Sequence, residues 1–210
     1  MLVAQVSTRE EALAALGAGA DGVVLMGAAV TAAAAAAATA AAGDDGQASA
    51  IRLVDDLHLL GARVWVQAGA PGSADGAPPV AFAGQGYQAA YVQAIADFAR
   101  AGVDGVIVDD WNALALTWPV ARDAGMPVIA GGALAAPSSA RRLFYERLGM
   151  AGTFISPQLS LGQVTRAAKG SGLELWSYIH GQLELLGEAA SAAGRWDHRM
   201  QRGRWALNGR

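Results

Sequence analysis

The fold is decided by a pattern seen most clearly in Ala101-Gly102-Val103-Asp104-Gly105-Val106-Ile107-Val108, where a glycine precedes a β-branched run. Glycine enters the left-handed conformation that closes a helix at no steric cost, so Gly102 predicts a helix end directly before a strand. The same pattern recurs at residues 18–25, 60–66, 124–130, 148–155 and 170–176. This alternation predicts a parallel sheet with helices packed outside it.

We therefore expect an α/β fold, a TIM-barrel-like (βα) repeat with about seven parallel strands. No eighth strand is visible, so the barrel is expected to be incomplete or irregularly closed. The expected organisation is a single domain over residues 1–186 and a basic C-terminal helix or tail over 187–210. The strands are predicted at residues 2–7, 22–26, 63–68, 105–109, 127–130, 152–156 and 173–179.

Composition excludes several classes of protein. The chain is 53% hydrophobic and 16% charged, which is typical of a globular domain and not of a disordered one. It contains no cysteine, which excludes disulfides, thiolate nucleophiles and cysteine-held iron–sulfur clusters. The chain contains no run of about 18 bulky apolar residues, so no membrane-spanning helix is predicted. The start is typical of a strand and not of a signal peptide, so we expect a cytoplasmic protein. No metal or cofactor is expected.

The C-terminal tail is basic, whereas the rest of the chain is acidic. From residue 195 onward, its tryptophans and charged residues are Arg195, Trp196, Asp197, Arg199, Arg202, Arg204, Trp205 and Arg210. Such a tail could contact nucleic acid or an acidic partner surface, but we favour a solvated or poorly ordered terminus. An apolar, incomplete barrel also favours self-association or a heteromer, with an unknown small-molecule or protein partner.

Several local features affect the expected architecture. The alanine-rich residues 28–42 predict a weakly anchored helix, and the Gly/Pro-rich residues 70–86 predict a loop that either covers an active site or has no role. Ser7-Thr8-Arg9-Glu10 predicts a capping box that opens the first helix. His58, on a helix beside two aspartates, is expected at the surface.

The sharpest chemical signal is Asp109-Asp110, which follows a buried strand. Side chains alternate along a strand, so the two carboxylates must point in different directions. One is expected to face the barrel mouth as a general base or metal ligand. The other is expected to cap the helix that begins near Trp111.

Other strand ends supply further candidates for the site. His180 ends the seventh strand, and its near-neutral pKa suits proton transfer, although it equally suits a hydrogen bond to the next loop. Gln67, Ser156 and Gln158 follow other strands and are candidate ligand-binding residues. No nucleophile and base can be paired from their spacing, which places a metal-independent hydrolase last among the hypotheses.

Gly131-Gly132 closes the strand Pro127-Val128-Ile129-Ala130 and resembles the phosphate-binding turn of barrels such as thiamine-phosphate synthase. Two glycines let backbone N–H groups approach an anion closely. This turn predicts one function for the chain, a small phosphate-ligand βα-barrel enzyme of lyase, isomerase or synthase type.

A second resemblance covers roughly residues 1–186. The chain reads Ile155-Ser156-Pro157-Gln158-Leu159-Ser160-Leu161-Gly162-Gln163-Val164 and then Leu173-Glu174-Leu175-Trp176-Ser177-Tyr178-Ile179-His180-Gly181. Together with the strand that ends at Asp109-Asp110, these phrases resemble the peptidase U32 family.

The U32 resemblance implies an incomplete βα-barrel. Members are linked to hydroxylation of RNA bases or ubiquinone precursors through a cysteine-held iron–sulfur cluster, and others to collagenase-like proteolysis. This chain has no cysteine, and the family's polar Ser-Thr-Gln and Arg-Glu positions here read Ala130-Gly131-Gly132 and Pro157-Gln158. The resemblance therefore implies a diverged, cluster-free relative that acts as a binding or accessory subunit.

Overall fold

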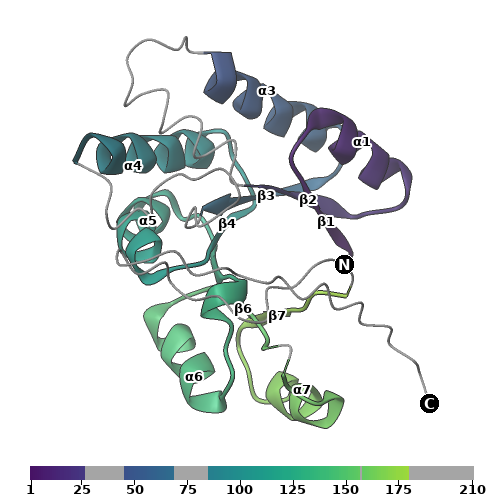
Figure 1. Ribbon diagram of the computed structural model, residues 1–210, viewed down its shortest axis with the longest axis vertical. Helices are drawn as coiled ribbons and strands as arrows, with labels where there is room; N and C mark the ends of the chain where they lie inside the picture. Colours follow the sequence, from purple (N-terminus) through teal and green to yellow (C-terminus); the bar gives the residue numbers. More distant parts are fainter. Residues whose placement is uncertain (27–44, 69–84, 157, 180–210) are drawn as a thin grey trace, which may run out of the picture.

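A computed structural model describes residues 1–26, 45–68, 85–156 and 158–179 of the chain. Strands and helices alternate along it (Figure 1). The strands are β1 (Val3–Val6), β2 (Gly22–Leu25), β3 (Arg63–Ala68), β4 (Gly105–Val108), β5 (Val128–Ala130), β6 (Gly152–Phe154) and β7 (Glu174–Trp176). The helices are α1 (Arg9–Gly17), α3 (Asp45–Leu59), α4 (Gln85–Arg100), α5 (Trp111–Ala124), the 3₁₀ helix η2 (Gly132–Leu134), α6 (Ser139–Leu148) and α7 (Leu161–Ala168).

The strands form one seven-stranded sheet in the order β1-β2-β3-β4-β5-β6-β7, and every pairing is parallel. The sheet curls, and the helices follow one another around its outside (Figure 1). Among the described residues, β1 and β7 remain unpaired edges, so the barrel is open there. The predicted fold class, a TIM-barrel-like (βα) repeat with an incomplete barrel, is therefore confirmed.

At five of the six repeats, a glycine in the left-handed conformation follows the helix, as the sequence predicts. The glycines with positive φ, each of which follows a helix, are Gly19, Gly61, Gly102, Gly125 and Gly149. The sixth repeat differs, because α7 is followed by Lys169 in a right-handed conformation. The first helix also begins one residue later than predicted, with a capping box between Thr8 and Glu11. That start turns Ala12 fully into the core.

Two apolar layers hold the half-barrel together. The outer layer packs the helices on the sheet and includes fully buried Tyr91, Ile95 and Phe98 of α4. The inner layer fills the barrel with the side chains of Val24, Trp65, Ile107, Ile129, Phe154 and Trp176. Trp65 and Trp176 meet edge to face with ring centroids 5.0 Å apart, which is a favourable aromatic geometry.

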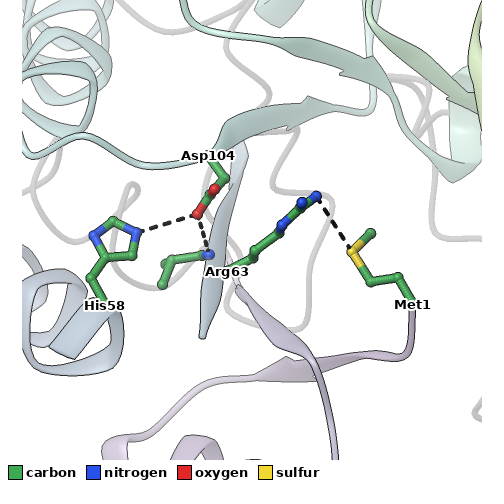
Figure 2. A network of polar contacts seen from close by, with 5 residues as sticks. Met1, His58, Arg63 and Asp104 are labelled. Carbon is green, nitrogen blue, oxygen red and sulfur yellow. Dashed lines mark hydrogen bonds and ion pairs between the residues drawn. The ribbon is translucent and has the colours of Figure 1, made fainter. Parts of the chain in front are cut away.

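A polar network lies at the amino-terminal end of the strands (Figure 2). Asp104 Oδ2 accepts a hydrogen bond from the Val64 N–H at 2.8 Å and lies 3.2 Å from His58 Nε2. The His58 side chain is about one-third exposed, and its contact with Asp104 joins α3 to the residue before β4. Arg63 Nη1 lies 3.9 Å from the Met1 sulfur.

Several predicted features lie outside the described residues: the alanine-rich helix 28–42, the loop 70–86 over most of its length, His180 and the tail 187–210. The division of the chain at residue 186 therefore stays a prediction. No helix in the described ranges has both the length and the apolar character needed to cross a membrane.

Candidate functional site

On the inner face of the sheet, a layer of polar side chains lies beyond the apolar inner layer, at the carboxyl ends of the strands. Side chains point inward at every second position of a strand. The inward series of β3 therefore runs from Trp65 to Gln67, and that of β4 from Ile107 to Asp109. Tyr178 follows Trp176 by the same spacing and packs against the inner layer. These residues lie at the carboxyl ends of their strands, where βα-barrels carry their chemistry.

A chain of hydrogen bonds links three of the strands across this layer. The Gln5 Nε2 amide of β1 donates to Gln67 Oε1 at 3.4 Å. The Gln67 Nε2 amide in turn donates to Asp109 Oδ2 directly after β4. Gln67 thus uses its acceptor on one side and its donor on the other, which determines the orientation of its amide. The Asp109 carboxylate is half-buried in this network.

The glycine pair after β5 makes room for the polar groups of the mouth. A Cβ atom at Gly131 would overlap the Asp109 carboxylate, with its Cγ only 2.8 Å away. A Cβ atom at Gly132 would lie 3.1 Å from the Tyr178 hydroxyl oxygen. Consecutive Cα atoms are about 3.8 Å apart, so the carboxylate and the hydroxyl approach neighbouring points of one backbone turn.

The predicted role of Gly131-Gly132 as an anion cradle meets three obstacles. The Gly131 N–H is already donated to the Val108 carbonyl at 2.7 Å, within the continuing strand ladder. The Asp109 carboxylate that lies against Gly131 would repel an anion. The helix behind the turn is the short 3₁₀ segment Gly132–Leu134 and not α6. The glycines provide close approach for side chains instead.

The environment of Tyr178 raises the pKa of its hydroxyl above the ordinary value of 10.0. Burial is the main cause, and the negative charge of Asp109 raises the pKa further, whereas a hydrogen bond with the Gln5 side chain lowers it. A tyrosine with a raised pKa stays protonated at neutral pH. The mouth therefore combines a carboxylate with a hydroxyl that can donate a hydrogen bond.

Asp110 takes the other of the two roles predicted for the aspartate pair. It is the N-cap of α5, and its Oδ1 accepts from the Asn112 and Ala113 N–H groups at 2.8 Å each. Its candidate catalytic role is corrected accordingly, because alternation along the strand turns it away from the inward face that Asp109 occupies. Its second oxygen, Oδ2, is buried without a hydrogen-bond partner.

The remaining predicted site residues are placed differently. Ser156 is half-buried after β6, and its Oγ accepts from the Gln158 N–H at 3.3 Å. Gln158 is exposed, and these two residues make a local turn. His180 lies outside the described residues. In the described parts of the chain, no group of three or more histidines, aspartates and glutamates is arranged to hold a metal ion.

Sequence reasoning missed Gln5 and Tyr178. Each lies two positions before a predicted strand-end residue, Gln5 before Ser7 and Tyr178 before His180, so counting back by the strand period of two would have found them. The sequence alone does not show how far each strand extends before its ladder stops.

The fold and the polar mouth together define a TIM-barrel-type protein. No protein-family model and no curated protein sequence matches the chain. Among solved structures, it resembles oxaloacetate acetylhydrolase with a TM-score of 0.53 and 16% identity, over 83% of this chain and 65% of that one.

Two further structures resemble the chain to a similar degree. One is 2,3-dimethylmalate lyase, a PEP mutase/isocitrate lyase superfamily member, with a TM-score of 0.53 and 15% identity over 84% of this chain and 66% of that one. The other is a protein from Burkholderia cenocepacia J2315 that is proposed to be a phosphonomutase, with a TM-score of 0.52 and 16% identity over 84% and 77%. At such identities the likeness shows the fold alone.

Proposed function

We propose that the chain is a small-molecule βα-barrel enzyme of the lyase type, with Asp109 as proton acceptor and Tyr178 as hydrogen-bond donor. The observation that carries the proposal is the Asp109 carboxylate, held by Gln67 at the barrel mouth near a protonated tyrosine. Similar barrels among solved structures include an oxaloacetate acetylhydrolase and a dimethylmalate lyase. They support a substrate with neighbouring hydroxyl or carbonyl groups.

The two groups supply complementary halves of a carbon–carbon cleavage. Asp109 takes the proton of a substrate hydroxyl, and the electron pair of that O–H bond forms a carbonyl. The adjacent carbon–carbon bond breaks, and its electrons move into the leaving fragment as an enolate. The Tyr178 hydroxyl donates a hydrogen bond to the enolate oxygen, where negative charge develops. Protonated Asp109 then delivers the proton it has taken to the enolate carbon, which completes the reaction and restores the carboxylate; in reverse, Asp109 removes that C–H proton beside the carbonyl.

Proton exchange gives a test that does not require the exact substrate. The protein is incubated in D₂O with a panel of small 2-oxo and 2-hydroxy acids, including oxaloacetate and 2,3-dimethylmalate, and the C–H signals beside the carbonyl are followed by NMR, together with cleavage products. We expect exchange or cleavage of at least one compound. D109N should slow it by about 10²–10⁴-fold, the usual contribution of a general base.

Asp110 offers a matched control beside the proposed base. D110N keeps a good helix cap, because asparagine caps as well as aspartate, and should leave the rate unchanged. A wild-type protein that neither exchanges nor cleaves any compound of the panel would contradict the proposal, as would a D109N variant with full activity.

The U32 resemblance supplies a second proposal, a binding or accessory subunit without catalysis. It rests on the sequence phrases at residues 102–110, 155–164 and 173–181. The proton-exchange experiment separates the two proposals. An accessory subunit would catalyse no exchange of substrate C–H protons, either as wild type or as D109N. The proposed enzyme role is favoured because the carboxylate and the tyrosine meet at one mouth.

A further inference from the structure

A pocket separate from the barrel mouth lies between α6 and α7. Its volume is about 260 Å³, and its polar and longer side chains are those of Ser138, Ser139, Arg142, Leu159, Gln163 and Arg166. Pockets that take drug-sized ligands measure roughly 300–1,000 Å³, so this one suits a smaller group. None of the residues used by the proposed catalytic reaction lines it.

The charge of the pocket is positive. Arg142 and Arg166 line it, and no aspartate or glutamate does. Within the part of the chain that the structure describes, Arg9, Arg100 and Arg122 form ion pairs with carboxylates, and neither Arg142 nor Arg166 does. Both of these unpaired side chains line the same small pocket. Their positive charge therefore remains available to an anion.

Arg142 is held in place before any ligand arrives. Its Nη1 donates to the Ala167 carbonyl of α7 at 2.5 Å, and its Nη2 donates to Ser139 Oγ at 2.9 Å. A guanidinium carries five N–H donors in a rigid fork, so donors remain after these contacts. Arg166, in the last turn of α7, is exposed and completes the pair from the facing helix. A ligand between them would be bound from both helices.

We propose that this pocket binds a phosphate group through Arg142 and Arg166. The planar guanidinium matches phosphate oxygens in bidentate geometry, and two such groups balance the double negative charge of a phosphate. Ser138, Ser139 and Gln163 add neutral polar groups. The bound group is either free inorganic phosphate or the terminal phosphate of a small phosphorylated metabolite, and the same contacts serve both.

Calorimetric titration of the full chain tests the proposal. Inorganic phosphate is titrated at constant ionic strength, then glycerol phosphate, with glycerol and chloride as blanks. We expect saturable binding with one site per chain. R166Q should weaken it by about tenfold or more, because a hydrogen bond to a charged group contributes strongly. Arg147, also on α6 but absent from the pocket lining, provides the control R147Q, which should bind as wild type does.

R142K completes the set, because lysine keeps the charge but loses the fork, and it should also weaken binding. Urea unfolding shows whether either variant has merely lost its fold, since Arg142 also connects α6 to α7. Tighter binding of glycerol phosphate than of inorganic phosphate identifies an organic ligand, and the reverse identifies free phosphate. The proposal is overturned if neither phosphate binds saturably, or if R166Q and R147Q weaken binding equally. The outcome is independent of proton exchange at Asp109.

Discussion

The side-chain amide of Gln67 donates a hydrogen bond to Asp109 Oδ2 between neighbouring strand ends of the half-barrel. Gln67 itself accepts from Gln5, so the carboxylate is oriented by a relay that begins on the edge strand β1. The relay connects β1, β3 and the end of β4 at the level where the apolar filling stops. The position of the proposed base therefore depends on side chains from distant parts of the sequence.

Replacement of Gln67 by leucine removes this relay at nearly constant volume. We expect Q67L to lower kcat/KM in the proton-exchange assay by about tenfold or more, because a hydrogen bond to a charged group contributes about 1.5–3 kcal/mol. Gln93 provides a control, since its amide donates to Asp97 at 2.8 Å on the exposed face of α4. Q93L should leave the rate unchanged. Equal rates for Q67L and wild type would show that Asp109 needs no orientation by Gln67.

An alanine at Gly131 should displace the carboxylate. The added Cβ would overlap Asp109 and lie 3.0 Å from Ile107 Cγ2. Overpacking of this kind costs about 1–3 kcal/mol, so we expect G131A to lower the free energy of unfolding by that amount and to reduce proton exchange. Gly17 is the control, because a Cβ there meets nothing within 4 Å. Urea unfolding in which G131A is as stable as G17A would contradict the close approach.

High pH should destabilise the fold through Tyr178. Its pKa is raised in the folded chain, mainly by burial and then by the charge of Asp109. The folded state therefore holds this proton more tightly than the unfolded state does. The resulting stability is fully present below about pH 10 and is lost as the pH rises through the folded pKa. Y178F should lose less stability between pH 9 and about pH 11 than wild type does.

Substitution of Asp109 tests whether its charge contributes to the raised pKa of Tyr178. D109N removes the negative charge that raises the Tyr178 pKa, so the tyrosinate absorbance of D109N should appear at lower pH than that of wild type. The difference spectrum between each protein and its Y178F counterpart isolates this tyrosine. An unchanged titration in D109N would mean that the carboxylate lies too far away to act on Tyr178.

The sequence predicts the fold because its signals are local. A glycine stop followed by an apolar strand needs no knowledge of distant residues, and each of the seven predicted strands is present. Local signals have a limit at Leu60, which is spaced like the buried Val54 and Leu57 on a helix and yet is 62% exposed. The helix α3 ends at Leu59, and the turn that follows directs Leu60 outward.

The candidate site was predictable only in part. Strand alternation separated the roles of Asp109 and Asp110 without assigning them, and the structure gives the cap to Asp110. Gln67 was predicted as a strand-end residue, whereas Gln5, which donates to Gln67, and Tyr178, which is close enough to Asp109 to feel its charge, were not. Their juxtaposition depends on how the half-barrel curls, which brings residues far apart in the sequence together, as it does for the rings of Trp65 and Trp176.

The network at the opposite end of the barrel should contribute to stability alone. Asp104 accepts from the Val64 N–H and contacts His58 (Figure 2). We expect D104A to lower the free energy of unfolding by about 1–3 kcal/mol, because a partly buried backbone donor loses its partner. Proton exchange should be unaffected, since βα-barrels keep catalysis at the other end. A loss of exchange without loss of stability would contradict this division.

Two substitutions of Asp110, the N-cap of α5, separate the contribution of its charge to stability from that of its hydrogen bonds. Asp110 Oδ1 accepts from two N–H groups of the first turn, while Oδ2 is buried without a partner. D110A removes the cap and should cost about 1 kcal/mol in urea unfolding at pH 7. D110N keeps the capping oxygen, and asparagine caps a helix as well as aspartate does, so its stability should equal that of wild type.

Ser138, the N-cap of α6, provides a reference for the size of the effect. Its side chain accepts a single hydrogen bond, from Arg141 N–H at 3.4 Å, so S138A should cost less than D110A. If D110N is as destabilised as D110A, then the negative charge at the start of α5, and not the hydrogen bonds, stabilises this helix. That result would point to the helix dipole as the main interaction of Asp110.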